Sequence, residues 1–230
     1  MKIGILMAGH APDPVRTEKG DFDAMFTRLL DGHGFDFDVY DVENMQFPSG
    51  PEAADGWLVS GSRHGAYEDH PFIPPLEEFI RATMEAGIPL VGICFGHQII
   101  AQALGGRVEK FADGWAIGRR TYVLADGSEV ALNAWHQDQV LTLPEGATRL
   151  GSSAFCENAV LAYGDRAFTV QPHPEFPGEV VEAYVDLRRG SGTYPDDQLE
   201  QAARDAALPL DTGRLSDAIA RFFKTRVAHV

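Results

Sequence analysis

Apolar residues in the first half of the chain follow two patterns in alternation. Short apolar runs suit the strands of a sheet, and they cover Lys2–Ala8, Phe35–Val42, Gly56–Ser60 and Pro89–Cys94. Helical spacing follows most of these runs, at Phe22–Leu30, Leu76–Met84 and Gly96–Gly106, whereas Gly9–Gly20 is predicted to be a polar loop. Parallel strands need helical crossovers, and the helices then cover both faces of the sheet. The pattern therefore predicts an α/β fold with an open, mostly parallel sheet flanked by helices.

The second half of the chain has shorter runs in which polar and apolar residues alternate. Such runs predict an antiparallel excursion from the sheet, with strands at Arg107–Phe111, Ile117–Leu124, Glu129–Trp135, Val140–Leu143 and Val160–Ala162. A strand at Phe168–Gln171 and a helix at Glu179–Leu187 come before a predicted exposed linker, Arg188–Pro195. The last helix carries an apolar stripe that should dock on the body, namely Leu215, Ala218, Ile219, Phe222 and Phe223. We therefore predict one domain over residues 1–187 and a C-terminal helical extension, residues 188–230, packed on that domain.

Length and charge narrow the functional classes. A chain of 230 residues suffices for one large α/β domain, and its net charge of −15 disfavours binding to nucleic acid or to an anionic membrane surface. The two cysteines, Cys94 and Cys156, are too few for a disulfide framework and fit a reducing compartment. The sequence has neither the pattern of a signal peptide nor an apolar stretch of about 20 residues. We expect a cytoplasmic protein without nucleic-acid or membrane partners.

Cys94 lies between two glycines, in Gly92-Ile93-Cys94-Phe95-Gly96, where a predicted strand meets a predicted helix. This is the nucleophile-elbow pattern, with cysteine in place of serine. Glycines allow a tight turn that exposes the side chain, and a helix N-terminus favours a thiolate and stabilises an oxyanion. An isolated cysteine is more often a small buried apolar residue. The two glycines and the position between strand and helix favour a nucleophile.

A cysteine nucleophile needs a neighbouring base and a third group that orients the base. The segment Gln171-Pro172-His173-Pro174-Glu175 directly follows a predicted strand and supplies both groups. The two prolines stiffen the backbone around His173, and the Glu175 carboxylate can hold the imidazole in the required tautomer. A lone histidine in a loop is usually only solvated. Because parallel strands end at the same edge of a sheet, we expect Cys94 and His173 to meet there.

These motifs resemble those of the class I glutamine amidotransferases, which have a Cys-His-Glu triad on a flavodoxin-like fold. Gly92–Gln98 is similar to the nucleophile signature of that family, and Gln171–Glu175 is similar to its His-x-Glu signature. Leu58–Ser62 occupies the place of the family's oxyanion strand and loop. The resemblance covers roughly residues 40–180 and leaves the C-terminal helices outside it.

The resemblance implies a role for each matched residue. Cys94 would attack a γ-glutamyl carbonyl to form a thioester, His173 would shuttle protons, and Glu175 would orient His173. Gln98 would position the substrate. The oxyanion hole would consist of the backbone N–H of Phe95 and that of Gly61 or Ser62.

Other segments match the family less closely. Trp135-His136-Gln137-Asp138 resembles the segment that lines the glutamine pocket, so His136, Gln137 and Asp138 are either substrate-binding residues or solvated groups of a turn. Many members of the family have Gly-Gly-Pro in the oxyanion loop, where this chain has Gly61-Ser62-Arg63. Four nearby side chains either bind the α-amino and α-carboxylate groups of a glutamyl substrate or solvate a loop: Arg63, His64, Tyr67 and Glu68. His97 is expected to be structural, and Cys156 is expected to have no chemical role.

No phosphate-binding loop of the type GxxxxGK(S/T) is present, and neither HxxEH nor paired-cysteine metal spacing occurs, so we predict no cofactor and no metal. Three functions stay open. The first is a stand-alone hydrolase that cleaves a γ-glutamyl amide bond in a small-molecule substrate, either glutamine or a γ-glutamyl peptide. The second is a glutaminase subunit that delivers ammonia to a separate synthetase partner. The third is a catalytically silent regulatory module, which has no physical need for a strained elbow at Cys94.

Overall fold

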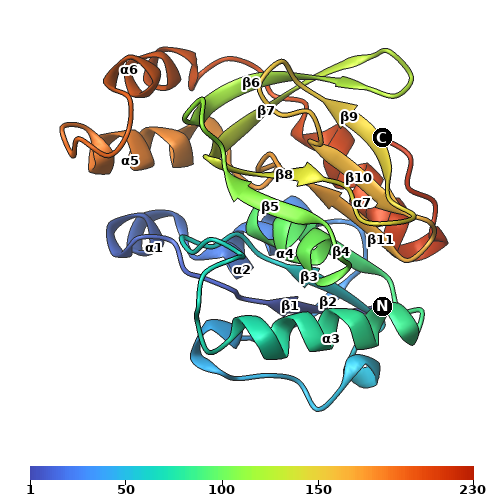
Figure 1. Cartoon of the computed structure of the whole chain (residues 1–230). Coiled ribbons are helices and arrows are strands. Elements are labelled where there is room, and N and C mark those ends of the chain that lie inside the picture. Colours follow the sequence, from blue (N-terminus) through green and yellow to red (C-terminus); the bar gives the residue numbers. More distant parts are fainter.

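The computed structural model describes all residues, 1–230, and a nine-stranded sheet with the order β2-β1-β3-β4-β11-β10-β9-β6-β7 forms its centre (Figure 1). The first five strands of this order are parallel: β1 (Lys2–Leu6), β2 (Asp36–Tyr40), β3 (Gly56–Val59), β4 (Leu90–Ile93) and β11 (Ala167–Val170). The others pair in antiparallel fashion: β6 (Ala116–Leu124), β7 (Glu129–His136), β9 (Thr148–Ser152) and β10 (Val160–Tyr163). A separate antiparallel pair consists of β5 (Arg107–Lys110) and β8 (Asp138–Thr142). The predicted fold class is confirmed, as a mixed sheet with a parallel half and an antiparallel half.

Helices cover both faces of the sheet because its strands are apolar on both sides. Successive residues of a strand point to opposite faces; in β3, for example, Leu58 joins one apolar core, whereas Trp57 and Val59 join the other. The Leu58 side is covered by α2 (Phe22–Leu29), α5 (Gly178–Arg188) and α7 (Thr212–Thr225). The opposite side is covered by α3 (Ile73–Glu85) and α4 (Phe95–Ala103). Two 3-10 turns, Val42–Asn44 and Pro51–Ala53, complete the parallel half.

Two elements differ from the prediction. The prediction of a polar loop over Gly9–Gly20 was wrong, because Asp13–Lys19 forms helix α1. This short helix buries only Val15 and so has no apolar stripe, although a proline lies in its first turn, where proline is favoured. Strand β9 was not predicted either, since Gly151 is its only buried residue. Neither segment has the apolar periodicity on which sequence analysis depends.

The C-terminal residues pack on the same sheet. Helix α6 (Asp196–Asp205) lies against β6 and α5, at the end of the molecule away from α3 (Figure 1). Helix α7 buries Leu215, Ile219 and Phe222 in the core that α2 also enters. The residues between α5 and α6 are largely exposed. None of these helices, nor any other in the structure, combines the length and apolarity that crossing a membrane requires.

Candidate active site

Cys94 lies on a strained turn between β4 and α4. Its backbone has φ +52° and ψ −103°, a conformation that costs a residue with a side chain about 1–3 kcal/mol. The glycines on either side permit close packing. A Cβ on Gly92 would lie 2.5 Å from the backbone of Gly96, and a Cβ on Gly96 would lie 2.2 Å from the carbonyl oxygen of Val59. The expected tight turn is therefore present, and its glycines bring β3, β4 and α4 together behind Cys94.

His173 follows β11 and is held on two sides. Its backbone N–H donates to the carbonyl oxygen of Asn133 in β7 at 2.8 Å. Its ring stacks on Phe176, with centroids 4.1 Å apart and an interplanar angle of 9°. The Asn133 amide nitrogen in turn donates to the carbonyl oxygen of Phe176 at 2.8 Å. These contacts fix both the backbone and the ring plane of His173.

Glu175 holds the His173 imidazole from the side away from the cleft. The distance between His173 Nδ1 and Glu175 Oε1 is 2.6 Å, and both side chains are buried. Burial alone would lower the pKa of His173, but the negative charges of Glu175 and of the Cys94 sulfur, with the hydrogen bonds to both, outweigh it and raise this pKa to about 10. The imidazole is therefore protonated at neutral pH, as a buried carboxylate requires of its partner.

The predicted oxyanion loop lies next to both residues. Gly61 follows β3, and a Cβ at this position would lie 3.2 Å from His173 Cε1 and 4.0 Å from Cys94 Cβ. The backbone N–H groups of Gly61 and Ser62 have no hydrogen-bond partner within the protein. Phe95 is the first residue of α4, where backbone N–H groups lack an intrahelical acceptor. The structure thus brings the loop of β3 and the start of α4 to Cys94.

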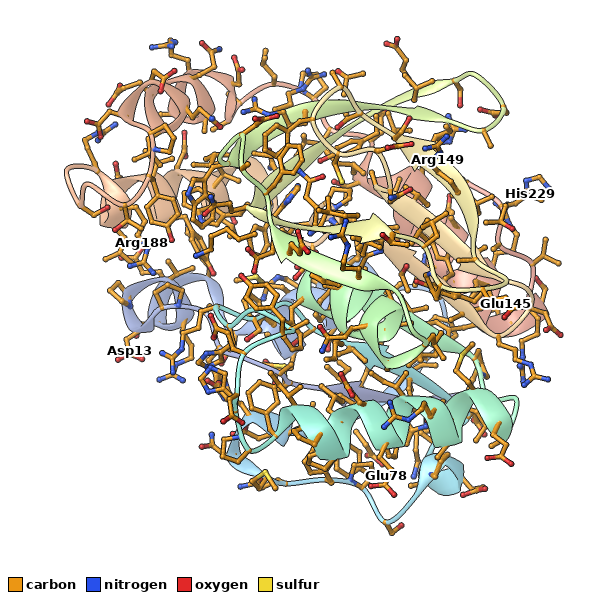
Figure 2. All side chains as sticks on the ribbon, viewed as in Figure 1. Asp13, Glu78, Glu145, Arg149, Arg188 and His229 are labelled. Atoms are coloured by element: carbon orange, nitrogen blue, oxygen red, sulfur yellow. The ribbon has the colours of Figure 1, made fainter.

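A cleft of about 560 Å³ leads to Cys94 and His173. Asp13 of α1 and Arg188 of α5 both line it, and they lie on the same side of the molecule (Figure 2). Part of the wall is aromatic, because Trp135 packs against Tyr184 and Tyr194 with ring centroids 5.1 and 5.6 Å apart. The cleft therefore has an apolar wall in addition to its polar floor.

Three of the four predicted substrate-binding residues, His136, Gln137 and Asp138, lie together where β7 ends and β8 begins. His136 is buried, and its Nδ1 lies 3.2 Å from the carbonyl oxygen of Asp138, which can only accept. Its Nε2 is buried and has no hydrogen-bond partner within the protein, while the residue as a whole contributes to the lining of the cleft. Burial, with the nearby charge of His173, lowers the pKa of His136 to about 3, so the ring is neutral. Gln137 also lines the cleft, and its amide nitrogen donates to the carbonyl oxygen of Phe111 at 3.3 Å.

Gln98 and Asp138 are tied to neighbouring residues. The amide nitrogen of Gln98 donates to the carbonyl oxygen of Asp138 at 2.9 Å and to Gln171 Oε1 at 3.1 Å. Burial raises the pKa of Asp138, and the neighbouring Tyr67 hydroxyl offsets only part of this rise. Burial and this carboxylate raise the pKa of Tyr67 to about 12. The hydrogen bonds of Gln98 thus fix residues at the base of the cleft. Tyr67, from the loop after β3, also lines the cleft.

Sequence reasoning missed Gln171 and Asn133. The amide nitrogen of Gln171 lies 3.6 Å from Cys94 Sγ. A signal for Gln171 existed, because alternate residues of an extended segment share a face, and Gln171, His173 and Glu175 alternate. Asn133 lies in a strand with no motif, and its contact with His173 appears only in three dimensions.

Two residues set aside in the sequence analysis are buried away from the cleft. His97 Nδ1 lies 2.8 Å from Thr169 Oγ1, and burial lowers the pKa of this histidine to about 3. Burial raises the pKa of Cys156 to about 12. A neutral imidazole and an inert thiol suit packing roles.

Comparison with known proteins now decides the family. Residues 22–184 match the family model for "Glutamine amidotransferase class-I". The chain belongs to the class I glutamine amidotransferase family. Within this family, it is 32% identical over 201 residues to gamma-glutamyl peptidase 3 of Arabidopsis thaliana, covering 80% of this chain and 81% of that protein.

A second relative is much longer than this chain. The chain is 30% identical over 169 residues to the glutamine-hydrolyzing GMP synthase of Prochlorococcus marinus, covering 67% of this chain and 31% of that protein. In fold, the chain is similar to the solved structure of a glutamine amidotransferase from Methylobacillus flagellatus, with a TM-score of 0.76 and 21% identity over 98% of this chain and 92% of that one. The structural match spans both the family region and the C-terminal helices.

Proposed function

We propose that this protein hydrolyses γ-glutamyl amide bonds through a γ-glutamyl thioester on Cys94. The observation that carries the proposal is the convergence of three segments. Cys94 from the end of β4, the His173–Glu175 pair from the end of β11, and the free N–H groups after β3 surround one point of the cleft. Nucleophile, base, orienting group and oxyanion donors are the components that acyl transfer needs.

In the first half of the reaction, Cys94 and His173 start as a thiolate–imidazolium pair, so the proton of the thiol is already on His173. The thiolate sulfur attacks the γ-carbonyl carbon, a C–S bond forms and the carbonyl π bond opens onto the oxygen. The carbonyl oxygen takes up negative charge next to the N–H of Phe95 and that of Gly61 or Ser62. His173, which is protonated up to a pH of about 10, donates a proton to the leaving amine. The C–N bond then breaks and leaves the γ-glutamyl thioester.

In the second half, water replaces the amine. His173, now neutral, accepts a proton from the water as its oxygen attacks the thioester carbon. The C–S bond breaks, glutamate leaves, and the cysteine and histidine return to their initial protonation state. Glu175 holds the same ring nitrogen throughout, because its buried carboxylate has no other partner for Oε1.

The cleft favours a γ-glutamyl peptide over glutamine. The leaving group of glutamine is ammonia, which is too small to need an extended binding surface. This cleft of about 560 Å³ has the size of sites for larger ligands. Its aromatic wall suits the remainder of a peptide. We assign His136, a neutral residue of the cleft lining, to contact with the glutamyl substrate.

A second candidate function follows from the likeness to GMP synthase, which covers only 31% of that protein. A glutaminase that delivers ammonia to a separate synthetase would need the same triad. It would hydrolyse glutamine slowly alone and faster with its partner, and would cleave γ-glutamyl peptides poorly.

The deciding experiment measures glutamate release from glutathione and from L-glutamine in parallel, with ammonia release as a second signal for glutamine. Cys94→Ala protein is the blank. Faster release from glutathione, absent in the blank, is expected. Fast turnover of glutamine alone would favour the glutaminase, and equal release by Cys94→Ala would contradict the thioester mechanism. No turnover of either substrate and no labelling of Cys94 by a glutamine-like electrophile would favour a silent module.

A further inference from the structure

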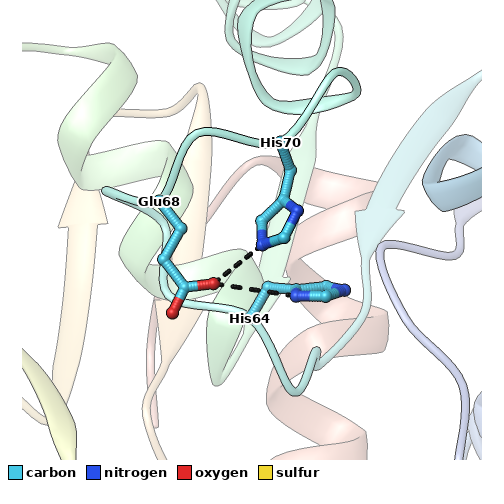
Figure 3. A group of neighbouring side chains, drawn as sticks. All are labelled: His64, Glu68 and His70. Carbon is cyan, nitrogen blue, oxygen red and sulfur yellow. Dashed lines mark hydrogen bonds and ion pairs between the residues drawn. The ribbon is translucent and has the colours of Figure 1, made fainter.

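The loop between β3 and α3 brings together three side chains that can bind a metal ion. His64, Glu68 and His70 point toward one another, as Figure 3 shows. Glu68 Oε2 lies 2.8 Å from His70 Nε2 and 3.7 Å from His64 Nδ1, and all three atoms lie within 4.8 Å of one another. The two imidazole rings have centroids only 3.9 Å apart. His64 and Glu68 also line the catalytic cleft.

A fourth residue orients one of these imidazoles. Glu43, from the turn after β2, has Oε1 at 2.9 Å from His64 Nε2 and at 3.2 Å from Arg63. A carboxylate that holds the outer ring nitrogen leaves the other nitrogen as the ligand and fixes the direction of its lone pair. The Glu43 carboxylate is largely buried, with 13% of its side chain exposed. His64 Nδ1 is thereby directed to Glu68 and His70.

We propose that His64, Glu68 and His70 form a binding site for a divalent transition-metal ion of the Zn²⁺ type, with Glu43 as the outer carboxylate. Two imidazoles and one carboxylate are a known zinc ligand set that leaves an exchangeable fourth position. Ligand atoms at about 2.1 Å from a tetrahedral ion are roughly 3.4 Å apart. The separations of 2.8 and 3.7 Å lie on either side of this value, so small side-chain rotations suffice.

This ligand set escapes the usual sequence patterns. His64, Glu68 and His70 lie in a loop with the spacing His-x3-Glu-x-His, not on one face of a helix. The same loop carries Gly61 and Ser62, so a bound ion would tie the outer part of the loop beside the proposed oxyanion hole. The site is independent of the hydrolase proposal, because none of its ligands belongs to the triad.

The test is a titration of tag-free, chelator-treated protein with Zn²⁺, followed by calorimetry and by the melting temperature. Cys94→Ala protein is used as the parent, because the thiol is itself a zinc ligand. We expect one equivalent to bind and to raise the melting temperature. Removing a ligand, in His70→Ala or Glu68→Gln, should weaken binding by at least about 100-fold, and Glu43→Gln should weaken it by about 10- to 100-fold.

His229→Ala is the matched control. This exposed histidine lies on the side of the molecule away from Asp13 and Arg188 of the cleft (Figure 2), and its removal should leave zinc binding unchanged. Melting temperatures without metal show whether each variant is folded. Co²⁺ in place of Zn²⁺ should give the visible absorption of a tetrahedral site. Two results would overturn the proposal: no saturable binding to the Cys94→Ala parent, even where the wild type binds the ion, or undiminished binding in folded His70→Ala and Glu68→Gln.

Discussion

Replacing Glu175 by glutamine tests how the site keeps a proton on His173. The substitution retains the shape and an acceptor oxygen 2.6 Å from Nδ1 but removes the charge. That charge is the foremost of the groups that raise the pKa of His173 from 6.5 to about 10 against the effect of burial. At 1.36 kcal/mol per pH unit, this rise is a net stabilisation of the imidazolium by on the order of 5 kcal/mol, which remains after Glu175 and Cys94 together have offset the penalty of burial.

The assay is the pH dependence of kcat/KM for glutathione cleavage between pH 6 and 11. In the wild type, activity should decline as the pH rises through about 10, where His173 loses its proton. In Glu175→Gln the alkaline decline should move down by more than one pH unit, and kcat/KM at pH 7 should fall by about 10- to 1,000-fold. Glu179→Gln, the same change at an exposed position, should leave the profile unchanged.

The raised pKa of His173 also makes the free energy of unfolding depend on pH. Because the pKa of folded His173 lies above its ordinary value of 6.5, the stabilisation from protonated His173 is fully present below pH 6.5 and is lost as the pH rises through about 10. Glu175→Gln should therefore lose most stability at neutral and acidic pH. An alkaline limit and an activity at pH 7 that match the wild type would refute the assignment of Glu175.

Three further outcomes follow from the packing and hydrogen bonds of the site. Cys94→Ala should lower kcat/KM by about 10⁴-fold or more, and Cys94→Gly should be equally inactive. The free energy of unfolding of Cys94→Gly should nevertheless exceed that of Cys94→Ala by about 1 kcal/mol, because glycine tolerates the positive φ. Gly96→Ala should destabilise by about 2–4 kcal/mol in urea unfolding, since its Cβ would meet backbone at 2.2 Å, while Gly213→Ala, with open space around it, should not destabilise. His136→Phe should raise KM by about 10- to 100-fold through loss of a polar contact with the glutamyl substrate, and an unchanged KM would remove His136 from the substrate site.

The parts of the site that could be predicted from the sequence are those fixed by strand ends. Cys94 and His173 each follow an apolar strand, and the parallel topology brings such ends together. Asn133 and its contact with His173 could not be predicted, because that contact depends on where the antiparallel half folds back. Strand β9, Thr148–Ser152, was invisible because nearly all its side chains are at least partly exposed, so no apolar alternation selects it. Helix α7 of the predicted extension, residues 188–230, enters the same core as α5.

A strand of the antiparallel half of the sheet binds the backbone of His173, the catalytic histidine of the proposed mechanism. β7 is the last strand of the sheet, so one of its edges has no strand partner. Alternate residues of an edge strand direct their N–H and C=O groups outward. Asn133 uses its outward carbonyl for the N–H of His173 at 2.8 Å. Two residues earlier, both backbone groups of Ala131 bind Asp211. The N–H of Ala131 donates to Asp211 Oδ2 at 2.8 Å, and the carbonyl of Ala131 accepts from the Asp211 N–H at 2.9 Å.

These contacts connect the C-terminal extension to the active site. Asp211 directly precedes α7, and α7 is anchored in the core by Leu215, Ile219 and Phe222. Docking of α7 therefore fixes Asp211, Asp211 fixes the edge of β7, and β7 fixes the backbone of His173. The family match ends at residue 184, yet the structural support of the imidazole continues beyond it. The extension is consequently part of the framework that positions His173 of the proposed triad, because without it the edge of β7 next to His173 would lack two of its hydrogen bonds.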